Sequence, residues 1–227
     1  MTNTLHRFGT ADSFVDDFVI IAIPTKGKKA TWDPLPGLKK VLQIALEYHP
    51  VNIGDALNGG GYRPTRHKWA IEHFNHRKPK PDFQTVIDGI TKPTTFAAIF
   101  DNADNAKAFV KRIKEEDLGL SINISSSLQN ALDCADYAGI KRHSVGYSLG
   151  FEGMKDNIPN RHVMMLSTMC GHGMISQAFA KKMVDWVKED RATPDEAVAA
   201  MGRFCSCGIF NPTRAKRIMA EARLKTF

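Results

Sequence analysis

Three of the four cysteines in this chain, and one of its histidines, gather in the stretch from residue 169 to residue 212. Cys170 and His172 belong to the segment TMCGHGM, and Cys205 and Cys207 belong to the segment FCSCGIFNP. Thiolates and imidazoles are the ligands that soft and borderline metal ions and iron–sulfur clusters prefer. These residue types therefore predict metal chemistry in this part of the chain.

The spacing of the cysteines predicts how they meet. In extended backbone, side chains two residues apart point to the same side, so Cys205 and Cys207 are expected to face one object. Cys170 is expected where a strand over 162–169 turns into a helix opened by Gly173, a position where the helix dipole favours a thiolate. If the helices between the two loops pack as a hairpin, three sulfurs converge.

Three thiolates with an optional fourth ligand suit a [4Fe–4S] cluster that keeps one iron open to substrate. A Cys₃His zinc site and a mononuclear iron site are the alternatives. In each case the metal is held by Cys170, Cys205 and Cys207, and an open position would act as a Lewis acid. Cys170 and His172 are the expected catalytic residues, with His172 as a ligand or a proton carrier.

Two other interpretations of the cysteines stay open. In a thiol–disulfide protein, Cys205 and Cys207 would form a short-loop disulfide that exchanges with Cys170. The cysteines could also be inert, because free cysteine is among the most buried residue types. The neighbouring glycines weigh against inert cysteines, since an ordinary core cysteine does not need them. Cys134, in a predicted helix without such neighbours, is expected to be structural.

Substrate contacts are predicted in the N-terminal third. Lys26 lies in a basic turn after a predicted strand, at the strand end where open α/β sheets place ligands. A glycine-rich loop over 51–63 follows, in which Asn58, Tyr62 and Arg63 are candidate contacts to a small, anionic substrate. The loop matches neither the dinucleotide fingerprint nor the phosphate-binding loop, and a flexible connector is the alternative.

The charge balance leaves a rival function open. The chain has 31 Lys and Arg against 24 Asp and Glu, a formal charge of +7. Such an excess is compatible with nucleic acid, with an anionic substrate or with solubility alone, and no nucleic-acid motif is present. The rival is therefore a non-enzymatic basic protein that binds nucleic acid or a protein partner and has structural cysteines. The favoured function is a metal-dependent oxidoreductase or lyase.

Hydropathy and cysteine spacing indicate the compartment. No run of eighteen apolar residues occurs, and residues 1–7 lack the apolar stretch of a secretory signal. Four cysteines at uneven spacings argue against a disulfide framework. The sequence indicates a soluble cytoplasmic protein that does not enter a membrane, and it leaves the oligomeric state undetermined.

Apolar periodicity and turn residues predict the elements. The expected strands lie at 18–23, 94–100, 121–125, 143–149 and 162–169. The expected helices lie at 36–49, 65–74, 82–90, 103–113 and 127–135, and three more follow residue 173. The last two of these start at the caps Thr193 and Asn211, each followed by proline, and they bracket Cys205 and Cys207. Alternation of strands and helices predicts an α/β (or α+β) fold with a layered sheet of about five strands, packed helices and a helical C-terminal segment.

Strand order and domain organisation are less determined. A Rossmann-like parallel order and a ferredoxin-like split βαβ order both fit the pattern. A run of charge and proline over 76–81 predicts a boundary between a strand/helix segment, 1–80, with the glycine-rich loop, and a main α/β domain, 81–227, that bears the cysteines. A single domain over 1–227 is the alternative.

Overall fold

The structure is a computed structural model that describes residues 7–25, 32–64, 81–146 and 158–224. Five strands form one antiparallel sheet in the order β3-β2-β4-β1-β5. The strands are β1 (Phe18–Pro24), β2 (Asn52–Asp55), β3 (Gly59–Gly60), β4 (Phe96–Phe100) and β5 (Leu120–Ser125).

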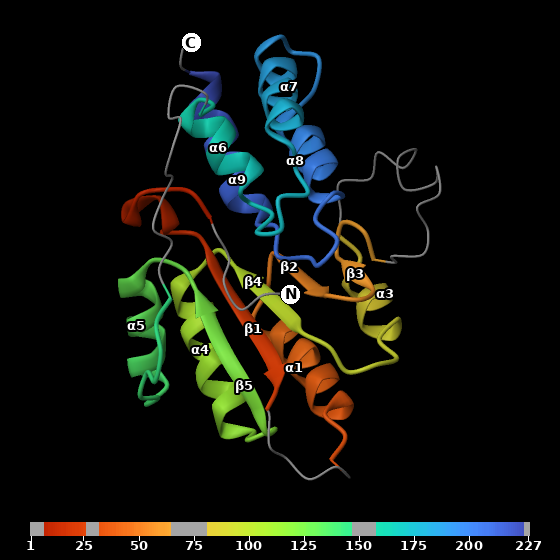
Figure 1. The fold of residues 1–227 in the computed structure, drawn as a ribbon, viewed down its shortest axis with the longest axis vertical. Helices are drawn as coiled ribbons and strands as arrows, with labels where there is room; N and C mark the ends of the chain where they lie inside the picture. The colour runs from red at the N-terminus through yellow and green to blue at the C-terminus, as the bar shows by residue number, and fades with distance from the viewer. Residues whose placement is uncertain (1–6, 26–31, 65–80, 147–157, 225–227) are drawn as a thin grey trace.

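The helices divide into two groups along the chain (Figure 1). The first group accompanies the strands and comprises η1 (Ala11–Phe14), α1 (Leu35–Glu47), α3 (Phe83–Asp88), α4 (Ala103–Glu115) and α5 (Leu128–Tyr137). The second group follows the last strand and comprises α6 (Arg161–Ser167), α7 (Gln177–Lys188), α8 (Pro194–Gly202) and α9 (Pro212–Arg223). None of the described helices is long and apolar enough to cross a membrane.

The connections between strands give the split βαβ pattern. The unit β1-α1-β2 and the unit β4-α4-β5 interleave, because β4 lies between β1 and β2 while β1 lies between β4 and β5. This antiparallel order is the ferredoxin-like alternative and excludes the parallel Rossmann-like one. The α/β fold with a helical C-terminal segment is confirmed, and the sheet draws strands from both sides of the expected boundary near residue 80.

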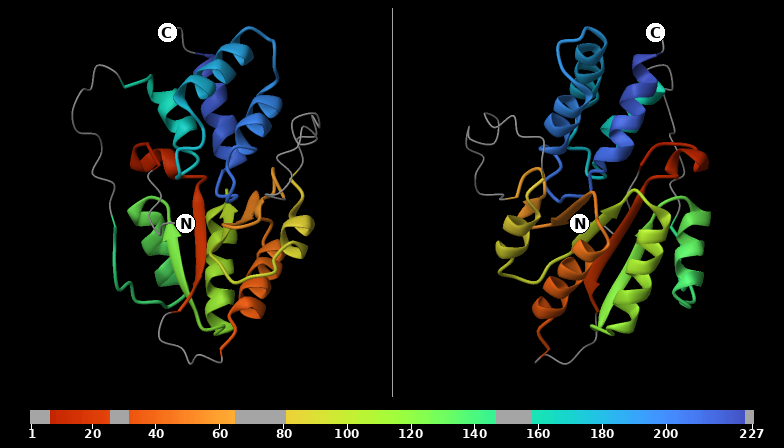
Figure 2. Two further views of the ribbon diagram at one scale, coloured as in Figure 1. Left: turned by 45° about the vertical axis from the view of Figure 1, so that its right-hand side comes forward. Right: turned by 180° about the vertical axis from the view of Figure 1, so that it is seen from behind.

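The two faces of the sheet support two separate cores. Ile20 and Ala22 of β1 pack toward α1 and α4, whereas Val19 and Ile21 belong to the cluster formed with the C-terminal helices. Figure 2 shows α1 and α4 on one side of the sheet and α6 to α9 gathered toward one end. Burial from both faces explains why the β1 segment is a continuous apolar run instead of an alternating one.

Two of the predicted strands are wrong. Residues 161–167 form helix α6, whose start is capped by the Asn160 side chain accepting from the backbone N–H of His162. A short apolar run of methionine and leucine fits a buried helix as well as a strand, and here the cap decides. Residues 143–146 have no regular structure. The rest of that predicted strand and the predicted helix over 65–74 lie outside the described residues.

A buried ionic cluster ties the segment before β1 to helix α9. The carboxylate of Asp17 accepts hydrogen bonds from Arg7 at 2.5 and 2.6 Å, from Arg214 at 2.7 Å and from Asn211 at 2.9 Å. Burial would raise the pKa of Asp17, but the charges of Arg7 and Arg214 together hold that pKa below its ordinary value. The sheet layer and the helical layer therefore share one buried charge cluster.

Candidate metal centre

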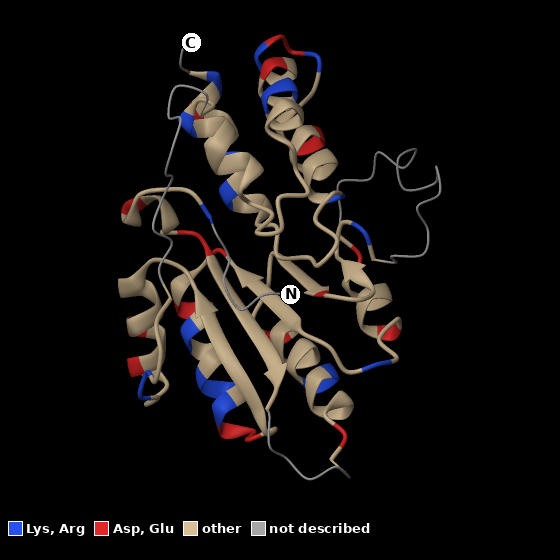
Figure 3. Ribbon diagram, viewed as in Figure 1, with Lys and Arg blue, Asp and Glu red and all other residues tan. Residues whose placement is uncertain are grey.

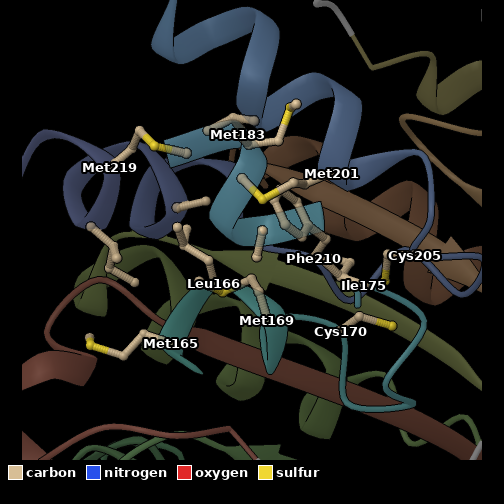
Figure 4. Close-up of a cluster of buried hydrophobic side chains, with 14 of the residues drawn as sticks. Met165, Leu166, Met169, Cys170, Ile175, Met183, Met201, Cys205, Phe210 and Met219 are labelled. Atoms are coloured by element: carbon tan, nitrogen blue, oxygen red, sulfur yellow. The ribbon is translucent and has the colours of Figure 1, made fainter. Parts of the chain in front are cut away.

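Two tight links of the helical layer carry the cysteines (Figure 4). Cys170 follows the C-terminal end of α6, in the turn that leads to α7, and Cys205 and Cys207 lie between α8 and α9. Gly173 and Gly208 have φ values of 69° and 72°, a region that favours glycine. Because α6 packs on α7 and α9, and α8 packs on α7 and α9, both links come to the same place.

The structure places the side chains of Cys170, Cys205, Cys207 and His172 next to one another, in that order. The side chain of Cys170 lies beside that of Cys205 in the same buried cluster. The sulfur of Cys205 lies 4.0 Å from that of Cys207, which lies 3.3 Å from Nδ1 of His172. All three cysteines are reduced and buried, whereas His172 is exposed. The imidazole therefore stands between the innermost thiols and the surface.

The contacts between the three thiols shift their pKa values in different directions. The hydrogen bond with Cys205 and burial raise the pKa of Cys170. For Cys205, contact with Cys170 acts to lower the pKa, but contact with Cys207 and burial outweigh it. The hydrogen bond from Cys205 lowers the pKa of Cys207. Of the three thiols, Cys207 is the one whose pKa is lowered. The expectation of a dipole-favoured thiolate at Cys170 is wrong because Cys170 follows a helix end.

The separations of neighbouring pairs resemble those of ligands around one ion. With metal–sulfur and metal–nitrogen lengths of about 2.3 and 2.1 Å, tetrahedral geometry places two sulfurs about 3.8 Å apart and a sulfur and nitrogen about 3.6 Å apart. The observed 4.0 and 3.3 Å lie close to these values. Within the described ranges, however, no three His, Cys, Asp or Glu side chains stand around a common point as a ready-made metal site.

The glycine-rich loop packs directly against the cysteine link. A Cβ atom added to Gly54 would lie 2.0 Å from the carbonyl oxygen of Cys207, and one added to Gly60 would lie 2.2 Å from the Cα of Gly208. These glycines allow backbone to approach backbone. The segment 51–63, predicted as a loop, contains the strands β2 and β3. The loop is therefore part of the support for Cys207 and not a flexible connector.

The candidate substrate residues lie beside this support. Asn58 donates a hydrogen bond to the carboxylate of Asp55. Tyr62 packs edge-on against Phe210 at 6.3 Å between ring centroids, and burial together with Asp195 raises its pKa to about 12. Arg63 is buried, and its backbone bridges to that of Gly60. Lys26 lies outside the described residues, and a substrate role for any of the four stays a prediction.

One residue that matters for the site had no signal in the sequence. Arg7 donates to the sulfur of Met169 at 3.4 Å and to the carbonyl oxygen of Ile209. A single guanidinium therefore touches the residue before Cys170 and a residue just after Cys207. Arg7 sits in a polar N-terminal stretch with no periodicity, so only the fold could reveal this contact.

Cys134 is separate from the other cysteines. It is buried in the core on the α1 and α4 face, among aliphatic and aromatic side chains. Burial raises the pKa of its thiol to about 11. Its surroundings agree with the predicted structural role, and it provides a natural reference for the three cysteines of the other core.

Comparison of the chain with protein-family models, with curated proteins and with solved structures finds no match. Basic residues are spread over several helices, with acidic residues on the same elements (Figure 3). Among the described residues, the two sulfur-bearing links are where thiol and imidazole side chains from distant parts of the chain meet.

Proposed function

We propose that the protein is a metal-dependent enzyme whose centre is held by the thiolates of Cys170, Cys205 and Cys207. A [4Fe–4S] cluster or a single zinc or iron ion is the proposed cofactor. The proposed reaction class is that of an oxidoreductase or lyase acting on a small, anionic molecule, in keeping with the formal charge of +7.

The observation that carries this proposal is the meeting of two distant links. Cys170 and His172 come from one link and Cys205 and Cys207 from another. Even so, Cys207 contacts both Cys205 and His172, and Cys170 lies beside Cys205 in the same buried cluster. The crowded glycines that bring backbone against Cys207 support a functional role, because an ordinary buried cysteine needs no such approach.

The pair separations bear on which cofactor is bound. The 4.0 Å between the sulfurs of Cys205 and Cys207 suits two ligands of one ion. Thiolates that ligate different irons of a cluster stand farther apart, because the separation of the irons adds to that of the ligands. A cluster therefore needs a larger rearrangement of the link than a single ion does.

His172 has one of two roles in this proposal. Its Nδ1 contacts Cys207 and its ring is exposed, so it is placed either to complete the coordination or to carry a proton between solvent and the centre. A bound metal with an open position would supply Lewis acidity. The buried thiols and the surrounding apolar cluster exclude water from the inner side of the site.

The test is purification without oxygen, followed by an absorption spectrum and analysis of iron, sulfide and zinc. Iron and sulfide in equal amounts with a broad visible band indicate a cluster, and zinc or iron without sulfide indicates a single ion. Cys205→Ser and Cys207→Ser should lose the metal, whereas the control Cys134→Ser should retain it. A folded wild-type protein without metal, which also fails to take up added iron and zinc, would contradict the proposal.

A second candidate is thiol–disulfide exchange, favoured by the division of the thiols. Cys207, whose pKa is lowered, would attack the disulfide of a substrate protein and release one substrate thiolate, which takes up a proton. Cys205, 4.0 Å away, would then displace the second substrate thiolate and leave a Cys205–Cys207 disulfide. Mass spectrometry of metal-free protein treated with a disulfide substrate detects that product, and its absence would exclude this candidate.

A further inference from the structure

The outer edge of the sheet at β5 lies beside a hollow. In the described residues β5 pairs with β1 along one edge only, and Figure 1 shows it as the last strand on its side of the sheet. A free strand edge presents backbone N–H and C=O groups that can pair with another strand, and proteins usually cover or blunt such edges.

The hollow has the length and volume for an extended chain. It measures about 1010 Å³, and all six residues of β5 line it. Its other walls are formed by α5, through residues such as Leu132 and Ala135, and by the irregular segment 140–146. A six-residue strand is about 20 Å long, so the hollow accompanies one strand over its whole length.

The two faces of β5 would offer different surroundings to a strand added there. Ile122 and Ile124 turn toward the aliphatic core, and Ser121 and Ser125 alternate with them on the other face. Between these two serines stands Asn123, whose Nδ2 is buried without a hydrogen-bond partner. A strand that alternates apolar and polar residues would match both faces.

Apolar and positively charged groups line the hollow. Leu128 and Val145 are each 41% exposed, which is high for large apolar side chains. Lys141 and Arg142 are exposed on the wall formed by segment 140–146, and Asp117 is the one carboxylate among the described lining residues. The charge favours an acidic occupant and disfavours a second copy of this chain, which would bring the same cations to the contact.

We propose that the hollow beside β5 is a docking groove for an extended acidic segment of a partner protein, which pairs as a sixth strand with the edge of β5 that no other described strand occupies. Its aliphatic residues would lie toward Ile122, Ile124 and Leu132, and its carboxylates toward Lys141 and Arg142. This groove is independent of the cysteines and of the function proposed for them.

Fluorescence anisotropy with a labelled hexapeptide of alternating valine and glutamate tests the groove. The peptide should bind saturably, and its counterpart with lysine in place of glutamate should not. Lys141→Glu combined with Arg142→Glu should weaken binding by about tenfold or more. The matched control, Lys181→Glu with Lys182→Glu on α7, should leave the affinity unchanged.

Backbone pairing is tested with two N-methylated forms of the peptide. Each form carries N-methyl groups on alternate residues, so each blocks one edge of the peptide strand. Pairing with β5 predicts that one form loses binding and the other keeps it. Equal affinities of the two forms, no binding of the parent peptide, full displacement by citrate or a dimer that excludes the peptide would each overturn the proposal.

Discussion

The two faces of the sheet are packed with different chemistry. The core against α1 and α4 is aliphatic and aromatic, and its sulfur comes from Cys134 alone. The core against α6 to α9 contains three cysteines and five methionines, Met165, Met169, Met183, Met201 and Met219. Methionine adapts to irregular spaces, and grouped thiols bind metals or exchange disulfides. The core against α1 and α4 therefore offers packing alone, whereas the core against α6 to α9 also has the thiols that a reactive centre needs.

The largest effect is expected where the two layers are joined. Asp17→Ala should lower the free energy of unfolding by about 3–5 kcal/mol, because it leaves the guanidinium groups of Arg7 and Arg214 buried without their shared carboxylate. Asp16→Ala is the adjacent control. It removes a part-exposed pair with Arg217, for which about 0.2–1 kcal/mol is expected. Urea unfolding measures both, and equal losses would contradict the central place of this cluster.

The same cluster predicts a slope of stability with pH. Because the folded pKa of Asp17 is depressed, its stabilisation is fully present above the ordinary value of 3.8 and is lost as the pH falls through the lower folded pKa. The wild type should therefore lose stability in strong acid, and Asp17→Asn should lack that part of the slope. Urea unfolding at a series of acidic pH values measures the free energy of unfolding of both proteins. The same dependence on pH for the wild type and Asp17→Asn would refute the prediction.

Two glycine substitutions in the sulfur-bearing layer distinguish the energetic cost of steric crowding from that of backbone strain. A Cβ atom on Gly208 would lie 2.4 Å from the carbonyl oxygen of Ile53, whereas one on Gly173 would meet nothing within 4 Å. Both have positive φ. Gly173→Ala should therefore cost about 1–2 kcal/mol from strain alone, and Gly208→Ala about 2–5 kcal/mol, because overpacking adds to the strain.

Thermal unfolding measures the stability of the two glycine variants, and metal analysis measures how much metal each variant retains. Gly208→Ala should also reduce the metal content, because it displaces the link that carries Cys207. Gly173→Ala should change the metal content little. Equal stabilities together with equal metal content would show that the contact between the glycine-rich loop and the link is not needed.

A smaller effect is expected in the reactivity of the thiols on the two faces of the sheet. In metal-free protein, iodoacetamide should modify Cys207 at a lower pH than Cys134, because the pKa of Cys207 is lowered and that of Cys134 is raised to about 11. Peptide mass spectrometry across a pH series measures both rates. His172→Ala should speed the modification of Cys207, since the imidazole covers it, and faster modification of Cys134 than Cys207 would contradict this division.

Local sequence signals predicted much of the fold. The apolar runs that became β1, β4 and β5 were identified, as were the starts of α8 and α9, where Thr193 and Asn211 cap helices that begin with proline. Helix α6 was predicted as a strand because a short run of methionine and leucine carries no clear period. The antiparallel order depends on which strands pair across the chain, and no local signal contains that.

The proximity of the two cysteine-bearing links was predictable to a similar extent. The two capped helices that bracket Cys205 and Cys207 made the meeting of the links foreseeable, and His172 came with Cys170. The support around them was not foreseeable, because Arg214 lies 197 residues after Asp17 and each of these charged residues looks like an ordinary surface residue. The need for glycine in the glycine-rich loop also comes from a tertiary contact, because the backbone of the loop packs against that of Gly208.

X-ray absorption at the edge of the metal retained by the protein tests the central claim most directly. The account predicts a first coordination shell made mainly of sulfur, with one light-atom ligand if His172 completes it. In protein loaded with the same metal, Cys170→Ser should lower the sulfur content of that shell, and Cys134→Ser should leave it unchanged. A shell of oxygen and nitrogen without sulfur would contradict the assignment of Cys170, Cys205 and Cys207 as ligands.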